Sequence, residues 1–313
     1  MRFLLLLGIP ALLGAQTPEQ LFLDGRLADA RIAFQARLAQ DRNDANAMYH
    51  LGRIAHAENT LGEATRWFER AVKGDGSNAL YHLWLGNALG EGASSASKVR
   101  QPFIARRVKS EFEKAVQLDP TLVAARMGLV DFYSVAPGFM GGSMDKAREQ
   151  ASVIVTLNAM RGHLAYARLA QRASDPAAEE VAYGAAIAAA PDSTQPYYAL
   201  GAMLRRQQRW DEAFAAYDRL IVARPDDVTA RALWGITAGQ SGMHLERGER
   251  ELKFYLANLP ANAAPVTISA VHYRMGQIYV ATGRQPLARV EYQAALNANP
   301  RNGPAKAALD SLR

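Results

Sequence analysis

Residues 197–225 have the sequence YYALGAMLRRQQRWDEAFAAYDRLIVARP. Apolar residues recur in this stretch at helical spacing in two blocks, and Pro225 closes the second block. Gly201 lies in the first block and Tyr217 in the second. A small residue lets two helix backbones approach each other, whereas proline ends a helix because it has no backbone N–H to donate. The stretch therefore predicts two helices that pack as a hairpin.

The same arrangement recurs along the chain. Pro191 and Pro225 lie 34 residues apart, and Pro260 follows 35 residues later. Pro120 and Pro300 close similar apolar stretches. A fixed period of this length is typical of repeat architectures, in which each repeat is one supersecondary unit packed on its neighbours.

The spacing within the repeat resembles the tetratricopeptide repeat, with its pattern W-x2-L-G-x2-Y, A-x3-F and P. The matching positions are Tyr197, Leu200, Gly201, Leu204, Ala213, Tyr217 and Pro225. The resemblance covers almost all of the chain after residue 16. It implies an all-α fold, a right-handed superhelical solenoid of antiparallel helix pairs with a concave inner surface. An irregular helical bundle is the alternative.

The repeats divide the chain into units of one predicted solenoid over residues 16–313. They are a divergent first unit at 17–44, units at about 45–78, 79–121, 122–158, 160–193, 194–227, 228–262 and 266–302, and a capping helix at 303–313. Two segments interrupt the pattern. Residues 91–107, which include EGASSASKVRQPF, are expected to project as a loop from a hairpin tip. Residues 136–144, APGFMGGSM, are expected to form an ordered turn because of their proline and glycines.

The first sixteen residues, MRFLLLLGIPALLGAQ, predict a signal peptide over residues 1–15. One arginine precedes an apolar run, and small residues follow it, so cleavage is expected after Ala15. The run is too short for a bilayer core, which needs about 20 helical residues. The prediction is a periplasmic or secreted protein with no transmembrane span in the mature chain. An uncleaved membrane anchor and an ordinary buried helix are the alternatives.

Composition narrows the functional classes. The 313 residues are 49% hydrophobic and 21% charged, which is typical of a globular protein. The absence of cysteine excludes a disulfide framework, thiol catalysis and cysteine-bound metal. The formal charge of +6 comes from Lys and Arg interspersed with acidic residues, so a nucleic-acid partner is not expected.

Motifs of catalysis are not found in the sequence. The six histidines never form H-E-x-x-H, and no G-x-S-x-G occurs. The glycine-rich PGFMGG matches no phosphate-binding pattern, so it is interpreted as a structural or partner-contacting loop. We therefore expect no catalytic residue, no metal and no cofactor.

The resemblance also implies where a partner binds, because the tetratricopeptide groove is lined mostly by the first helix of each unit. The corresponding residues are Tyr49, Arg53, His56, Asn87, Arg168, Arg172, Tyr198, Arg205 and Tyr273, with loop contacts expected from Phe139 and Met140. Arginine forks pair well with carboxylates, which favours an acidic protein or peptide. The alternative is a solvated helix face neutralised by nearby Glu179, Glu180 and Asp211.

These observations predict a non-catalytic scaffold or adaptor that holds a peptide or partner protein in a groove. A structural component of an envelope complex is one alternative. An enzyme or small-molecule carrier is another, and it would require a pocket enclosed by the two inserted segments. Fold alone does not choose among them.

Overall fold

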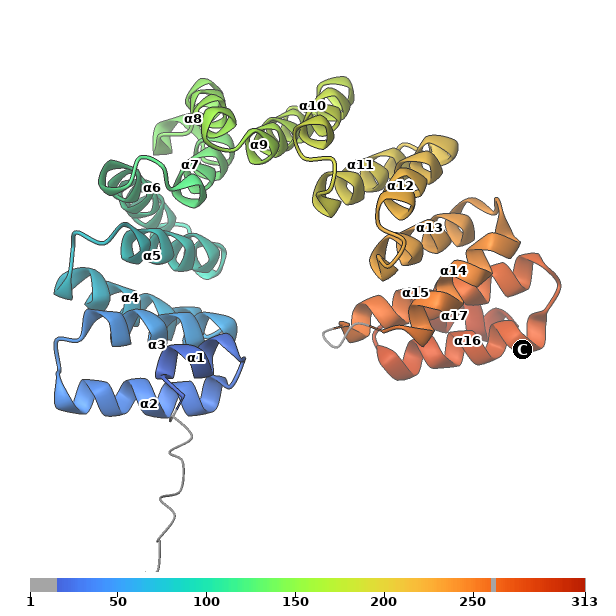
Figure 1. The fold of residues 1–313 in the computed structure, drawn as a ribbon, viewed down its shortest axis with the longest axis horizontal. Coiled ribbons are helices and arrows are strands. Elements are labelled where there is room, and N and C mark those ends of the chain that lie inside the picture. The colour runs from blue at the N-terminus through green and yellow to red at the C-terminus, as the bar shows by residue number, and fades with distance from the viewer. Residues whose placement is uncertain (1–15, 260–262, 313) are drawn as a thin grey trace, which may run out of the picture. The chain divides into compact units, whose positions relative to one another are not determined.

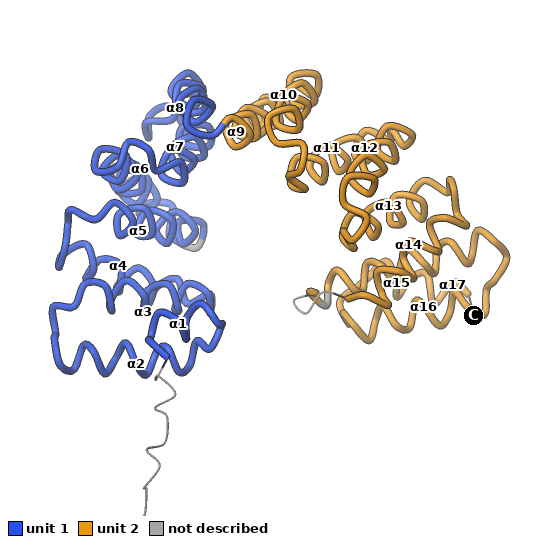
Figure 2. Tube along the Cα trace, in the orientation of Figure 1, with its two compact units in different colours: residues 1–158 blue, residues 159–313 orange. Residues whose placement is uncertain are grey.

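A computed structural model describes residues 16–259 and 263–312, and the predicted signal peptide lies outside them. The described residues form seventeen α-helices and two short 3-10 helices, which confirms the predicted all-α class (Figure 1). They fall into two compact units, residues 1–158 and 159–313 (Figure 2).

The helices of the first unit are α1 (Pro18–Leu23), α2 (Leu27–Gln40), α3 (Ala45–Ala57), α4 (Leu61–Gly74), α5 (Ala79–Gly92), η1 (Ala93–Ser95), α6 (Gln101–Leu118), α7 (Val123–Val135), η2 (Gly138–Met140) and α8 (Met144–Leu157). Those of the second unit are α9 (Ala159–Arg172), α10 (Pro176–Ala189), α11 (Thr194–Arg206), α12 (Trp210–Ala223), α13 (Val228–Ser241), α14 (Leu245–Ala257), α15 (Pro265–Ala281), α16 (Gln285–Ala298) and α17 (Gly303–Ser311).

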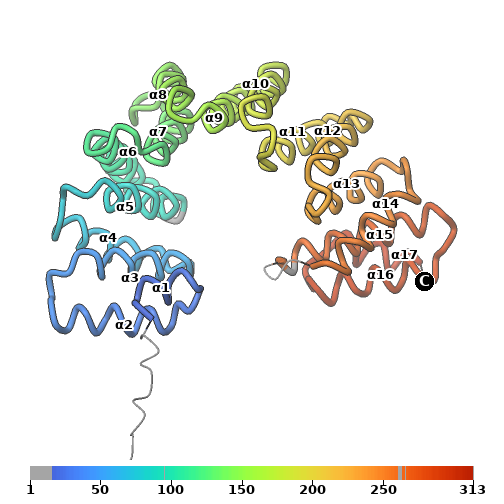
Figure 3. The backbone as a smooth tube through the Cα atoms, in the orientation of Figure 1, coloured from blue at the N-terminus to red at the C-terminus, as the bar shows by residue number. Residues whose placement is uncertain are grey.

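Successive helices pack as hairpins, which can be followed along the tube in Figure 3. In the first unit α3 packs on α4, α5 on α6 and α7 on α8. In the second unit α9 packs on α10, α11 on α12, α13 on α14 and α15 on α16. Each predicted repeat from 45–78 to 266–302 contains one of these pairs.

Glycines of the first helix let the large side chains of the second helix lie at the crossing point. A Cβ atom at Gly52 would lie 2.6 Å from the ring of Phe68, and one at Gly201 would lie 2.4 Å from the ring of Tyr217. Both aromatic side chains are fully buried. Interiors packed this closely have no room for an added methyl group. The small residues in the repeat pattern therefore set the distance between paired helices.

The turn inside several pairs contains a residue in the left-handed backbone region. Asn59 (φ 59°), Ser174 (φ 56°) and Gln208 (φ 59°) occupy this position in the turns after α3, α9 and α11. Gly283 (φ 72°) does so after α15. A left-handed residue reverses the chain within a few residues of the helix end, which keeps the paired helices antiparallel.

The two inserted segments differ in structure. The loop expected over residues 91–107 is shorter than predicted, because residues from Gln101 onward form the first turns of α6, where Pro102 occupies an initial helical position. The ordered turn expected at residues 136–144 is present. Gly141 has a φ of 96°, and a Cβ atom at Gly142 would lie 1.7 Å from the Ala136 carbonyl oxygen, so only glycine fits there.

Helix α17 packs on α16 and covers the last pair. Ala305 is fully buried, and Leu309 and Leu312 contact the core formed by α14, α15 and α16. Lys306 and Asp310 are exposed, as expected for a capping helix with one polar face. Within the described ranges, no helix is both long and apolar enough to cross a membrane.

Candidate functional site

The predicted groove residues fall in both units. In the first unit Arg53 is enclosed by aromatic rings. Its guanidinium carbon lies 4.2 Å from the centroid of the Trp84 ring and 5.0 Å from that of Phe22. Its Nη1 donates a hydrogen bond of 3.0 Å to the Tyr49 hydroxyl. These contacts hold Arg53 inside the repeat stack, where it bridges α1, α3 and α5.

Tyr49 is buried, with only 7% of its surface exposed. Its ring packs 5.1 Å from that of Tyr81 and 6.2 Å from that of Phe68, measured between centroids. Helix α3 contacts α2, α4 and α5, so residues on several of its faces are covered. Tyr49 is therefore a core residue and presents no open ring face to a partner.

The other predicted residues of this unit differ in their surroundings. The Nε2 atom of His56 lies 2.9 Å from a carboxylate oxygen of Glu91. Asn87 and Met140 line a cavity of about 550 Å³ between α5, α6, α7 and the 136–144 turn. Phe139, in the same turn, is 83% exposed. The first unit thus has a cavity lined by both inserted segments, where the alternative of an enzyme or small-molecule carrier requires a pocket.

In the second unit Tyr198 has a partner within the chain. Its hydroxyl donates to the carboxylate of Asp227 at 2.7 Å, and Asp227 also accepts from the backbone N–H of Ala230 at the start of α13. Burial raises the pKa of the Tyr198 hydroxyl, and the hydrogen bond to Asp227 raises it further. Tyr198 therefore joins α11 to α13 through its hydroxyl group.

Arg205 lies at the centre of a group of polar side chains from three helices. Its Nη2 donates to the side-chain oxygen of Gln240 on α13 at 3.0 Å. Gly239, the neighbour of Gln240, faces Arg274 so closely that a Cβ atom at Gly239 would lie 2.9 Å from the Arg274 carbonyl oxygen. Helices α11, α13 and α15 therefore bring Arg205 and Arg274 to the same region.

Arg274 is held by its own helix. Its Nη1 donates to the Gln277 side-chain oxygen at 2.6 Å, and its guanidinium carbon lies 5.2 Å from the centroid of the Tyr273 ring. Gln277 in turn donates to the Tyr273 hydroxyl at 3.1 Å. Burial lowers the pKa of Arg274, and the positive charge of Arg205 lowers it further. We call Arg205, Gln240, Tyr273, Arg274 and Gln277 the cationic cluster.

Some other arginines of the second unit have carboxylate partners. Arg206 forms a salt bridge of 2.9 Å with Glu179, and Arg209 pairs with both Glu180 and Glu212. Among the described residues, by contrast, Arg205 and Arg274 form no salt bridge with a carboxylate, since their hydrogen-bond acceptors are amide oxygens. Of the other two predicted arginines, Arg168 is half-buried on α9 and Arg172 is exposed at its end.

The arrangement can bind an anion without any chemical step. Two guanidinium groups close together, with no carboxylate between them, favour a carboxylate or phosphate from outside the chain. The sequence predicted Arg205 and Tyr273 but missed Arg274 and Gln240. Arg274 directly follows Tyr273 in the sequence, so a basic residue next to a predicted groove position was visible. It was not predicted because it does not occupy one of the helix positions that line the groove in the tetratricopeptide family. Within the described ranges, His, Asp and Glu form no group of three or more that could hold a metal ion.

The fold and these contacts define an all-α repeat protein with polar sites on its first helices. A family model described as tetratricopeptide repeat matches residues 24–79 and 160–228. These two segments therefore resemble the tetratricopeptide repeat, a fold that is typical of scaffolds that bind proteins or peptides. Such repeats are usually non-catalytic. No curated protein sequence matches this chain.

Solved structures share the fold at low sequence identity. A tetratricopeptide repeat protein from Parabacteroides merdae is 11% identical with a TM-score of 0.53, over 94% of this chain and 95% of that chain. A monomeric mutant of IFIT1 with m7Gppp-AAAA is 14% identical with a TM-score of 0.53, over 94% and 70%. A chain of the Cut9–Hcn1 hetero-tetramer of APC/C is 13% identical with a TM-score of 0.52, over 94% of this chain but 54% of that one. This chain therefore spans about half the length of the latter, and these identities show the fold alone.

Proposed function

We propose that this protein is a non-catalytic scaffold that binds an acidic segment of a partner protein at the cationic cluster. The observation that carries the proposal is the pair Arg205 and Arg274, whose charges repel each other and whose hydrogen-bond acceptors are neutral amides. An acidic side chain or a chain-terminal carboxylate would accept from both guanidinium groups and relieve this repulsion. Tyr273 would supply an amphipathic contact beside them.

The proposal narrows the site predicted from the sequence. Arg53 and Tyr49 contribute to packing within the first unit, and Tyr198 is engaged by Asp227. Arg205 and Tyr273 remain as partner contacts, and Arg274 joins them. The proposed function therefore depends on three helices of the second unit, α11, α13 and α15.

Binding to fluorescent peptides of equal length, one rich in glutamate and one with glutamine in its place, tests the proposal. We expect the acidic peptide to bind at least about tenfold more tightly, a difference of about 1.4 kcal/mol, and to weaken as salt is added. The double variant Arg205→Gln, Arg274→Gln should lose this preference. The matched control Arg250→Gln, Arg301→Gln removes the same charge from exposed positions of the second unit and should retain it. An equal loss of the preference for the acidic peptide in both variants would show that the preference depends on net charge alone. The cationic cluster would then not be the binding site.

We propose also that the protein is exported to the periplasm or secreted, on the basis of its first fifteen residues. Expression of the full chain in a bacterial host with a periplasm, followed by fractionation and N-terminal sequencing, tests this. A periplasmic product beginning at Gln16 would support cleavage after Ala15. A cytoplasmic product that still begins at residue 1 would contradict it.

A further inference from the structure

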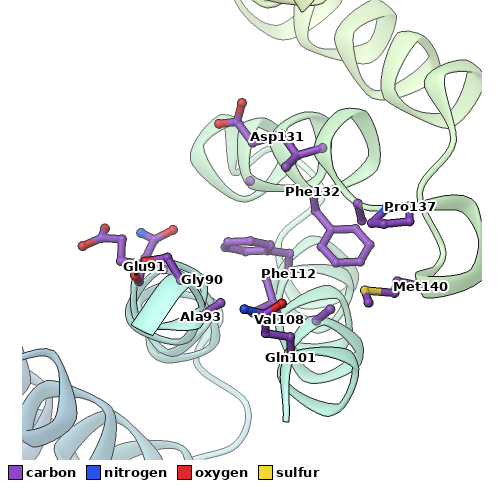
Figure 4. A pocket seen from close by; sticks show the side chains of 17 residues that line it. Gly90, Glu91, Ala93, Gln101, Val108, Phe112, Asp131, Phe132, Pro137 and Met140 are labelled. Atoms are coloured by element: carbon purple, nitrogen blue, oxygen red, sulfur yellow. Dashed lines mark hydrogen bonds between the residues drawn. The ribbon is translucent and has the colours of Figure 1, made fainter. Parts of the chain in front are cut away.

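The first unit contains a cavity of about 550 Å³ that the cationic cluster does not involve. Its volume is within the range of about 300–1,000 Å³ that is typical of ligand pockets. Figure 4 shows the rings of Phe112 and Phe132 facing the interior, with Val108 beside them and Pro137 and Met140 on the side opposite Glu91. Of the seventeen lining residues that the structure describes, twelve are apolar or glycine, two are acidic and none is basic.

Both inserted segments contribute walls to this cavity. The first supplies η1 and the initial turn of α6, through Ala93 and Gln101. The second supplies Pro137 and Met140 of the ordered turn. The two inserted segments thus enclose the cavity together with residues of the repeat helices, such as Gly86, Phe112 and Gly128.

Glycines determine how much of the cavity stays empty. Gly86 of α5 and Gly128 of α7 each face the ring of Phe112, and a Cβ atom at either would lie 2.7 Å from it. Phe112 is therefore held in place as the floor of the cavity. Gly90 differs, because a Cβ atom there would meet only Val108, at 3.8 Å. A larger side chain would fit sterically at Gly90, and its absence leaves space open.

Charge and exposure limit what the cavity can accept. Glu91 and Asp131 are its only charged lining residues among those described, and we call them the acidic mouth. Both also interact within the chain, Glu91 through His56 Nε2 at 2.9 Å. Apolar surface continues outside the cavity, since Val135 lines it yet is 67% exposed, and Phe139 of the adjoining turn is 83% exposed. An occupant that covers these side chains must be larger than the cavity itself, and exposed apolar surface of this kind is typical of protein contact sites.

We propose that the cavity is a second docking site, which binds a peptide segment of a partner through one large apolar side chain next to a lysine or arginine. The apolar side chain enters against Phe112 and Phe132, and the neighbouring cation pairs with Glu91 and Asp131. The flanking peptide covers Val135 and Phe139. This site prefers a cation, whereas the cationic cluster of the second unit prefers an anion, so the two sites select different segments.

The test selects short random peptides displayed on phage against the full-length protein and then measures displacement of the neutral apolar dye N-phenyl-1-naphthylamine. We expect the selected peptides to share a large apolar residue beside Lys or Arg and to displace the dye. Gly90→Leu should fill the cavity and weaken both dye and peptide binding at least about tenfold. The control Gly184→Leu, at a helical glycine of α10 with no neighbour within 4 Å, should leave both unchanged.

Further variants separate the cation from the apolar contact. Glu91→Gln with Asp131→Asn should lower peptide affinity about tenfold while dye binding is kept, because the dye is uncharged. Val135→Lys, at an exposed position of the wall, should repel the peptide and serves as a second blocking variant if Gly90→Leu fails to fold. The Arg205→Gln, Arg274→Gln variant should bind these peptides normally, so that failure of this site and failure of the proposed function are distinguishable.

Three results would overturn the proposal. Selected peptides that are acidic, or that lack a cation beside the apolar residue, would contradict the acidic mouth. Equal binding to the parent and to folded Gly90→Leu would place the peptide elsewhere. Dye displacement by decylammonium but by no peptide would make the cavity a site for a small apolar amine and not for a partner protein.

Discussion

A Cβ atom at Gly201 would lie 2.4 Å from the Cζ atom of Tyr217, because the two residues face each other where α11 crosses α12. Tyr217 is fully buried, so its ring cannot move aside without disturbing its neighbours. The same relation between a glycine and a large residue recurs in other helix pairs. It explains why the repeat tolerates glycine inside a helix, where glycine by itself is unfavourable.

Gly201→Ala is expected to lower the free energy of unfolding by about 1–3 kcal/mol, the usual effect of overpacking. Gly184→Ala is the matched control, since it also replaces a helical glycine but has no neighbour within 4 Å. This control should raise the free energy of unfolding by about 0.5–1 kcal/mol through helix propensity. Urea denaturation followed by circular dichroism measures both. A gain in stability at Gly201 would show that the helices can separate at little cost.

Replacement of Arg53 should affect stability and leave partner binding intact. Arg53→Gln removes the cation that stacks on Trp84 and the donor to Tyr49, so we expect a loss of about 1 kcal/mol in the free energy of unfolding. Binding of the glutamate-rich peptide should not change, because Arg53 lies in the other unit. A loss of peptide affinity without a loss of stability would mean that Arg53 contacts the partner, as the sequence predicted.

Arg205 and Arg274 should show repulsive coupling in a double-mutant cycle. Either single change to glutamine relieves the repulsion, so the double variant should be less stable than the sum of the single effects predicts, by about 0.5–1 kcal/mol. The coupling should decrease as salt is added, because salt screens like charges. Additive effects at low salt would mean that the two guanidinium groups do not interact.

Glu249 should make part of the stability dependent on pH. Its carboxylate lies 2.7 Å from Lys253 Nζ and 2.6 Å from Arg284 Nη2. Burial alone would raise the pKa of Glu249, but hydrogen bonds and charges from Arg284 and Lys253 outweigh it and lower the pKa to about 2. The unfolded chain, with the ordinary pKa of 4.5, then binds the proton first. This contribution is therefore complete above about pH 4.5 and is lost as the pH falls towards 2.

Urea denaturation between pH 5 and 2 measures this contribution. We expect Glu249→Gln to reduce the change in unfolding free energy over that interval by about 1–2 kcal/mol, less than the full pKa difference implies because both cationic partners are partly exposed. Asp145→Asn is the control, since its side chain is 94% exposed and contributes little. The same pH dependence in the parent and in Glu249→Gln would contradict the assigned ion pairs.

The helix pairs were predictable from the sequence because their signals are local. The apolar period of residues 197–225, the position of Gly201 relative to Tyr217 and the proline at 225 each act within one hairpin. The structure of the inserted segment at 91–107 was harder to predict, since part of the segment forms helix and part forms loop. Its boundary depends on how Pro102 starts α6, which the repeat pattern does not describe.

The sequence by itself determined the all-α class, the repeat length and which residues could carry a partner's charge. Only the tertiary structure decided which of these residues already pair with other side chains of the same chain. Arg206 meets Glu179 and Tyr198 meets Asp227, whereas Arg205 and Arg274 meet amides. The partners of Arg206, Tyr198 and Arg205 come from other helices, and periodicity within one repeat contains no information about side chains that meet across several. The cavity under the inserted segments has the same origin, because its walls come from three helices and two loops.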